Sequence, residues 1–227
     1  MNNLTVTKSN KLIEASYQLN TNAQKLLLCC IAQLDSRVDA ITNKEMTITT
    51  LEYERLTGVS NPRRELYKSV DALFRSSVIV KSNESEEVEV YWIQKKTKKH
   101  KGDGAITVVW SEDVLQYLTQ LQSRFTSYKL ANISELNTAH AIRLYELLMR
   151  FKGTGERVIF VDDFKSALGI SDKYKDYKAL NQWVIQPSLR ELKKSNLDIE
   201  FIPIKKGRKI EALGFTFKEK SQREMDI

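Results

Sequence analysis

The chain is poor in the residues that interrupt regular structure or cross-link secreted proteins. It has three prolines and eight glycines in 227 residues, so we expect an ordered fold from about residue 21 to about residue 218. Its two cysteines, Cys29 and Cys30, are adjacent within an apolar helical pattern. This placement is typical of reduced core residues, and we therefore expect a cytoplasmic protein without disulfides.

Long apolar runs are also missing. The longest, Leu26–Ala32, falls far short of the roughly 20 residues that a membrane-spanning helix needs. The first ten residues, MNNLTVTKSN, are polar and lack the apolar centre of a signal peptide. We expect no membrane partner.

The usual motifs of catalysis are not found. No G-x-x-x-x-G-K-[ST] loop occurs, which argues against nucleotide hydrolysis. The two histidines, His100 and His140, lie far apart in the sequence, and no cysteine–histidine spacing fits zinc. The prediction is a protein that is not an enzyme and needs no cofactor and no metal.

What the chain does have is positive charge. Its 36 lysines and arginines outnumber its 29 aspartates and glutamates, giving a net charge of +7 and a pI near 9.2. Such a surface attracts polyanions, although charge alone does not choose among DNA, RNA and an anionic membrane.

The stretch 174–196 organises the chain. Leu180, Val184, Leu189 and Leu192 can line one face of a helix if the helix adjusts near Pro187. A shorter helix at 162–168 and a glycine-containing turn at 169–171 precede it, which is the pattern of a helix-turn-helix. Two strands, 197–204 and 210–217, follow. Their basic connection, 205–209, has the position of a wing.

An earlier stretch shows the same pattern. We expect a short helix at 50–56 and a second one at 62–75 that turns Phe74 toward the core. Strands are expected at 77–81, 88–94 and 105–110, forming an antiparallel meander. The loop 95–104 carries many lysines and would be the wing of this first helix-turn-helix.

Internal similarity links the two halves. Leu136-Asn137-Thr138 repeats Leu19-Asn20-Thr21, and Leu168-Gly169-Ile170-Ser171 corresponds to Thr57-Gly58-Val59-Ser60. We therefore predict an α+β fold of two tandem winged-helix domains, each a helix-turn-helix with a β-hairpin wing, related by a divergent internal duplication. Residues 1–124 and 125–227 would form the two domains, and residues 4–19 an arm.

The candidate DNA contacts are the cations and amides of these helices and wings, because such side chains bind phosphates and the edges of adenine. In the second domain they are Lys173, Lys175, Lys178, Asn181, Gln182, Lys205, Lys206, Arg208 and Lys209. In the first domain they are Arg63, Arg64, Lys68, Lys95, Lys96, Lys98 and Lys99.

Four segments resemble a known family, the iteron-binding, theta-type plasmid replication initiators. They are KSNKLIEASYQLNTNAQKLLLCCIAQL, HAIRLYELLMRF, YKALNQWVIQPSLREL and IKKGRKIEALGFTF, and together they span nearly the whole chain. The N-terminal segment and the V-I-x-P-x-L-x-E-L pattern are fairly specific. A generic helix-turn-helix is not.

The resemblance implies a mechanism and a set of partners. In such bacterial initiators the second domain is the principal reader of duplex DNA at origin iterons. The first domain reads the other half of each iteron in the monomer, or forms a homodimer in equilibrium with the monomer that represses the protein's own promoter. Monomers open the origin and recruit the host initiator and the replicative helicase.

One departure from the family pattern concerns base reading. The family often has basic residues before its V-I-x-P segment, where this chain has Asn181, Gln182 and Trp183. Asparagine and glutamine can each bond adenine through two atoms, so direct base reading is retained as a hypothesis. We expect Trp183 in the core or at an interface.

Two other functions fit parts of the pattern. A two-domain winged-helix transcriptional repressor would have the same DNA-binding elements without a role in replication. A relaxase or recombinase would instead use one of the nine tyrosines as a nucleophile. A covalent adduct with supercoiled plasmid DNA would reveal that chemistry.

Overall fold

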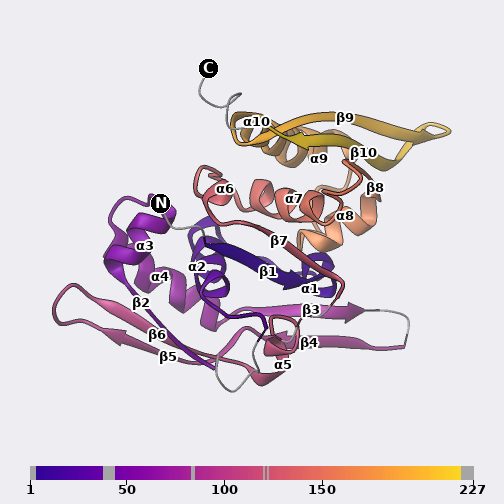
Figure 1. The fold of residues 1–227 in the computed structure, drawn as a ribbon. Coiled ribbons are helices and arrows are strands. Elements are labelled where there is room, and N and C mark those ends of the chain that lie inside the picture. Colours follow the sequence, from indigo (N-terminus) through magenta and orange to yellow (C-terminus); the bar gives the residue numbers. More distant parts are fainter. Residues whose placement is uncertain (1–3, 38–43, 83–84, 120, 122, 221–227) are drawn as a thin grey trace. The chain divides into compact units, whose positions relative to one another are not determined.

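The computed structural model describes residues 4–37, 44–82, 85–119, 121 and 123–220. The chain divides into two compact units, residues 1–135 and residues 136–227, which are described separately. Both contain helices and strands (Figure 1). Within the described ranges, no helix combines the length and the apolar character that crossing a bilayer requires.

The first unit is built around helices α2 and α4, which pack against each other. Leu26, Leu27 and Leu28 of α2 are fully buried, as are Cys29 and Cys30. Burial raises the pKa of the Cys29 thiol to about 12. The helices of this unit are α1 Asn10–Glu14, α2 Thr21–Ala32, α3 Thr50–Thr57, α4 Pro62–Phe74, α5 Glu112–Leu115 and α6 Ala131–Ser134.

The strands of the first unit form three small antiparallel sheets, with orders β2-β6-β5, β3-β4 and β1-β7. The predicted single meander is therefore wrong. The run expected at 88–94 is broken at Trp92, whose fully buried indole separates β4 from β5. The strands are β1 Thr5–Ser9, β2 Glu45–Thr49, β3 Ser77–Ser82, β4 Glu87–Tyr91, β5 Ile93–Lys99, β6 Ala105–Trp110 and β7 Phe125–Lys129.

The N-terminal residues belong to the core of the first unit. Val6 of β1 and both Leu12 and Ile13 of α1 are fully buried, and β1 pairs along its whole length with β7. The expected arm at 4–19 is therefore wrong. Because β7 completes this pairing, the division between the units falls after residue 135 and not after residue 124.

The second unit has a single sheet of order β8-β10-β9, on which α8 contacts β8 and β10 and α10 contacts β9, while α7 packs against α10. Ile159, Leu213 and Phe215 point into this core. The β9–β10 hairpin projects well beyond the helices of its unit (Figure 1). The elements are α7 Ala139–Met149, β8 Glu156–Phe160, α8 Val161–Ala167, α9 Tyr177–Leu180, the π-helical turn η1 Asn181–Ile185, α10 Gln186–Lys194, β9 Leu197–Lys206 and β10 Lys209–Glu219.

Both units repeat one topology. In each, a buried helix is followed by a strand, two helices and a hairpin, and the first strand pairs with the last strand of the hairpin. The two sheets β2-β6-β5 and β8-β10-β9 thus have the same strand order. In the first unit the β3–β4 hairpin is inserted before β5. This repetition is the fold of two winged-helix domains.

Helix starts differ between the copies. Asn20 caps α2 by accepting a 2.9 Å hydrogen bond from the Ala23 amide, whereas Thr138 caps α7 by accepting from the Ala141 amide at 3.2 Å. The capping residue has moved by one place within the repeated Leu-Asn-Thr motif.

Candidate nucleic-acid interface

The helix of the second unit that we name the recognition helix runs through α9, η1 and α10. Asp176 caps it, accepting a 2.8 Å hydrogen bond from the Ala179 amide. Lys173 and Lys175 therefore precede the helix, on a turn in which Tyr174 has a φ of 51°. The prediction that placed Lys175 on the helix is wrong, although both lysines are exposed.

A π-helical turn gives this helix a single buried face. Leu180 and Leu189 are nine residues apart, about two and a half turns at 3.6 residues per turn, so a regular α-helix would place them on opposite sides. The wider turn at η1 absorbs one residue. As a result Leu180, Val184, Leu189 and Leu192 are all buried.

The opposite face carries polar side chains at intervals of four. Lys178, Gln182 and Arg190 are exposed, and Gln186 is half-buried. The Gln186 side-chain amide donates to Asn181 Oδ1 at 3.2 Å, so that oxygen already has a partner. Reasoning from the sequence missed Gln186 and Arg190, because their alignment with Lys178 depends on the π-helical turn.

Trp183 is 63% exposed on the recognition helix. Its neighbours Val184 and Ile185 are both fully buried and fill the core positions of this turn. Of the two places expected for Trp183, the core is therefore wrong, and the interface stays a prediction. A large indole in solvent, on the same helix as exposed cations and amides, has an apolar surface that a ligand could cover.

The β9–β10 hairpin, which we name the second wing, ends in a two-residue turn. Gly207 has a φ of 61°, as a hairpin turn of type II′ requires of its first residue. Lys205, Lys206, Arg208 and Lys209 are all exposed around it. Lys206 is 3.1 Å from Glu211 Oε1, a solvent-facing ion pair. The cations of this wing are thus presented at its tip.

The matching helix of the first unit is α4, which begins at Pro62 as predicted and differs from the prediction near its C-terminal end. Asn61 occupies the capping position with a φ of 55° but makes no side-chain capping bond. Phe74, expected to face inward, is 37% exposed. Arg64 and Lys68 are exposed. Their helix turns Leu66 and Val70 into the core.

Arg63 has a structural partner at the hairpin of the first unit. Its guanidinium donates to the carbonyl oxygens of His100 and, at 3.4 Å, of Gly102. Tyr67 donates to the Lys99 carbonyl at 2.5 Å, and its ring meets that of His100 edge-on. These contacts fasten the turn between β5 and β6 to α4. Arg63 is therefore less available to DNA than Arg64.

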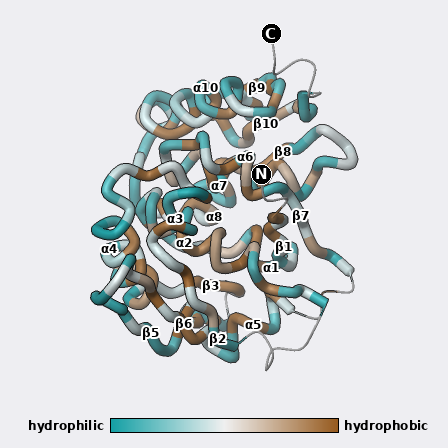
Figure 2. Tube along the Cα trace, turned by 60° about the vertical axis from the view of Figure 1, so that its left-hand side comes forward, coloured by the Kyte–Doolittle hydropathy of each residue, from teal (hydrophilic) through white to brown (hydrophobic). Residues whose placement is uncertain are grey.

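The β5–β6 hairpin, which we name the first wing, holds its lysines on a strand and not in the expected loop. Strand β5 is hydrophilic along most of its length (Figure 2). Lys95 and Lys99 are exposed on one side of it. Lys96 and Lys98 lie on the other side and both pair with the carboxylate of Asp71 on α4, Lys98 at 2.6 Å.

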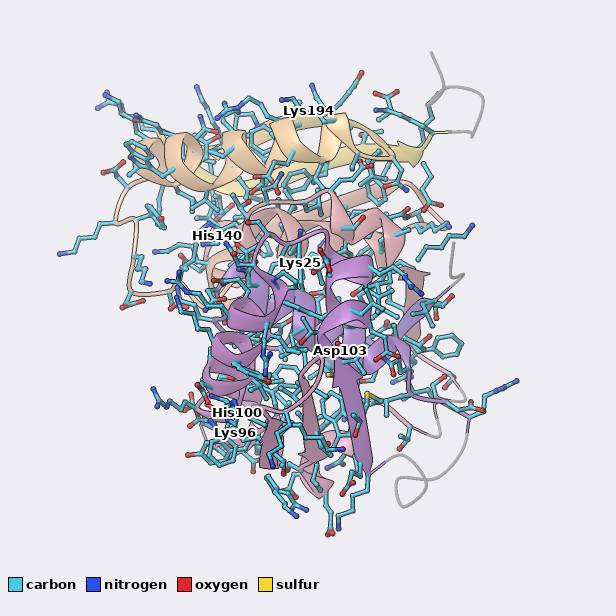
Figure 3. All side chains as sticks on the ribbon, turned by 90° about the vertical axis from the view of Figure 1, so that its left-hand side faces the viewer. Lys25, Lys96, His100, Asp103, His140 and Lys194 are labelled. Atoms are coloured by element: carbon cyan, nitrogen blue, oxygen red, sulfur yellow. The ribbon has the colours of Figure 1, made fainter. Side chains whose placement is uncertain are left out.

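The two lysines that pair with Asp71 favour the ionised form of its carboxyl. Partial burial would raise the pKa of its carboxyl, but the hydrogen bonds and charges of Lys96 and Lys98 outweigh that effect and lower the pKa below its ordinary value. Lys96 also lies 4.8 Å from the centre of the Phe74 ring. Lys96 and His100 lie along the same hairpin (Figure 3). Part of the positive charge of the first wing is therefore neutralised by a carboxylate of its own unit.

Over the parts of the chain that the structure describes, no group of three or more histidine, cysteine, aspartate or glutamate side chains is placed to hold a metal ion. His140 is half-buried near the start of α7. Burial, and secondarily the charge of Lys173, lower its pKa.

Family models match both units. A model described as "Initiator Replication protein, WH1" matches residues 5–149, and one described as "Initiator Rep protein, WH2" matches residues 161–217. Among curated proteins, an Escherichia coli "Replication initiation protein" is 29% identical over 236 residues, covering 100% of this chain and 73% of the relative. An "Uncharacterized 27.6 kDa protein" of Escherichia coli is 26% identical, covering 66% of this chain and 68% of that protein.

Solved structures show the same fold. The Pi initiator protein, crystallised in complex with iteron DNA, superposes with a TM-score of 0.82 at 19% identity, covering 98% of this chain and 100% of that one. Domains 2 and 3 of RctB superpose with a TM-score of 0.51 at 11% identity, covering 90% of this chain and 84% of theirs. At such identities the likeness concerns the fold alone.

Proposed function

The chain belongs to the family of initiator replication proteins, and on that premise we propose that it initiates plasmid replication by binding repeated duplex DNA sites, or iterons, at the origin. The Pi initiator, whose structure has the same fold, was crystallised with iteron DNA. The proposal extends that ligand to this chain. The expected compartment is the bacterial cytoplasm.

The observation that carries the proposal is the arrangement of the second unit. Its recognition helix has one largely apolar face in the core and an opposite face with Lys178, Gln182 and Arg190 exposed. Its wing projects beyond the helices and ends in exposed cations (Figure 1). A helix of this kind enters the major groove while a wing follows the adjacent backbone. We assign principal DNA recognition to this unit.

For the first unit we propose an auxiliary role in DNA binding. Arg64, Lys68, Lys95 and Lys99 are exposed and can bind phosphates. Arg63, Lys96 and Lys98 already hold the first wing to α4. This reduces the positive charge that the first unit can present to DNA. Consistent with the resemblance, we also assign to this unit the contact of a homodimer that is in equilibrium with the monomer.

The later steps of initiation belong to the same proposal. Monomers bound to successive iterons open the origin and recruit the host initiator and the replicative helicase, while dimers bind the protein's own promoter and repress it. The support for these steps is membership of the family.

The test is a fluorescence-anisotropy titration of the DNA immediately upstream of this protein's gene, with scrambled competitor and at several salt concentrations. We expect binding that survives the competitor and fills repeated sites stepwise. Binding that competitor and salt abolish together would show only a generic affinity for polyanions, and the origin-binding proposal would then be withdrawn.

Two variants sharpen that titration. Lys178→Ala should weaken binding to all DNA and lower the slope of log K against log salt by about one, because one phosphate contact is lost. Lys152→Ala is the matched control. Lys152 pairs with Glu219 and lies outside the recognition helix and the wing, so the slope should not change. Equal slopes for the two variants would contradict our placement of the helix.

A further inference from the structure

Trp183 differs from the other two tryptophans of the chain. Trp92 and Trp110 are fully buried in the first unit, whereas Trp183 is 63% exposed. An indole is among the largest apolar side chains, and leaving it in water forgoes the free energy that its burial would give. Its exposure on a helix that we assign to DNA points to a ligand that covers it.

The neighbours of Trp183 fix where this surface lies. Val184 and Ile185 are fully buried, so the backbone of the π-helical turn is anchored directly beside the indole. Gln182, the preceding residue, is exposed, and Lys178 lies one turn earlier on the outer face. Trp183 is therefore held on a rigid element, beside a side chain that can bond a base and one that can bond a phosphate.

Resting on the proposed function, we infer that Trp183 reads a thymine by covering its 5-methyl group in the major groove. The thymine methyl is the apolar group among the base edges displayed in that groove, and apolar side chains recognise it by contact. Adenine, its pairing partner, offers the donor and acceptor that a glutamine such as Gln182 can bond through two atoms. One A·T pair or two neighbouring pairs would satisfy both residues.

This contact would also explain why an indole stands at position 183, where the family often has a basic residue. A cation at position 183 would add affinity for any sequence, because phosphates are everywhere along the duplex. An indole adds little affinity for phosphate and much for an apolar group. Trp183 would therefore contribute specificity, and its loss would change which sites are bound more than how tightly DNA in general is bound.

The experiment replaces single thymines of the bound site by deoxyuridine, which removes the 5-methyl group and leaves the base pairing intact. For the unmodified chain, one or two replacements should weaken binding about fourfold, the effect of exposing roughly one buried methyl group. Trp183→Ala should bind the thymine and deoxyuridine sites equally. Lys178→Ala is the control, and it should bind both more weakly while keeping the difference between them.

A second readout uses the tryptophan itself. Because Trp92 and Trp110 are buried, quenching of fluorescence by acrylamide reports mainly on Trp183. Cognate DNA should protect it from quenching. A Trp183→Phe variant, which keeps an apolar ring, should retain part of the methyl dependence.

The outcomes separate the two proposals. Specific binding with no deoxyuridine effect, an unchanged effect in Trp183→Ala, or undiminished quenching in the complex would each overturn the assignment of Trp183 alone. Failure of the unmodified chain to prefer its upstream DNA over the scrambled competitor would overturn the proposed function, and this inference with it.

Discussion

Arg143 and Glu146 form an ion pair inside the second unit. The Arg143 guanidinium lies 2.7 Å from Glu146 Oε2, and the two side chains are 3% and 0% exposed. Arg143 also donates to the Ala167 carbonyl at 3.0 Å, which ties α7 to the end of α8. A buried charge of this kind is tolerated only while its partner is present. The pair therefore lets Arg143 stay buried, where its bond to Ala167 links α7 to α8.

Removing one partner should expose that dependence. Glu146→Ala leaves the Arg143 charge buried without its carboxylate, and we expect the free energy of unfolding to fall by about 3–5 kcal/mol. Glu211→Ala, which breaks the solvent-facing pair with Lys206, should cost about 0–1 kcal/mol. Urea unfolding of both variants measures the contrast. Similar losses in the two variants would contradict it.

His140 should make the stability of the second unit depend on pH. Burial, followed by the charge of Lys173, lowers its pKa from the ordinary value of 6.5. The unfolded chain then takes up the proton first as the pH falls, so the stabilisation is complete above 6.5 and is lost below it. Urea unfolding at about pH 7.5 and about pH 5.5 should show a larger loss for the unmodified chain than for His140→Gln. Equal losses would contradict the shift.

Among single residues, the sequence predicted best those whose position follows from periodicity. Leu180, Val184, Leu189 and Leu192 are buried as expected. Phe74, which was expected to face inward, and Trp183, for which the core was one of two expected places, are aromatic residues at the margin of an apolar face. There the direction of one side chain depends on neighbouring elements that the pattern of a single helix does not contain.

Among the elements, the recognition helix contains both a proline, Pro187, and a π-helical turn that absorbs one additional residue. The two features are related. In an uninterrupted α-helix, the ring of Pro187 would clash with the carbonyl of residue 183, four places earlier. The π-helical turn at Asn181–Ile185 lies just before that proline. It widens the helix where the clash would arise and also returns Leu189 to the buried face.

Deleting Gln182 should test this account. The deletion removes the extra residue and favours a continuous α-helix, in which Pro187 is then misplaced. We expect the combined variant, with Gln182 deleted and Pro187→Ala, to be more stable than the deletion alone by about 3 kcal/mol. Pro187→Ala by itself should have a small effect. Urea unfolding is the measurement, and no gain from the second change would mean that the turn has another cause.

The sequence predicted the second wing better than the first. The strands on either side of Gly207 are two continuous runs, and the glycine with its positive φ marks the turn between them. Around Lys95–Lys99, charge suggested a loop. In the structure those lysines lie on an edge strand that pairs with β6, and Asp71 on α4 pairs with two of them. A partner that is distant in sequence cannot be inferred from local composition.

For the molecule as a whole, the repeated motifs were enough to predict two winged-helix domains, but not where one ends. The expected boundary after residue 124 separates β7 from the strand with which it pairs. In the structure β1 and β7 are in register from Thr5 with Lys129 to Ser9 with Phe125. Lys25 also donates to the Ser134 carbonyl at 2.7 Å. These long-range pairings have no signature in a single sequence.

Truncation should distinguish the two boundaries. A fragment of residues 1–135 retains β7 and α6, and we expect it to unfold cooperatively in urea. A fragment of residues 1–124 leaves β1 without its partner strand and removes one of the two carbonyls that accept from Lys25, so it should be largely unfolded without denaturant. Circular dichroism of both fragments checks this. Equal stability would place the boundary after residue 124.

The pairing of β1 with β7 also has a consequence for biosynthesis. Thr7 and Ser127, whose hydroxyls meet at 2.8 Å, are separated by 120 positions. At about 5–20 residues per second, the ribosome adds that length in roughly 6–24 s. Until then Val6, Leu12 and Ile13 have no completed core to enter, and nascent chains on one messenger could associate through them. Chaperone demand should therefore be set by the first unit, and faster elongation through it should raise the yield of soluble protein.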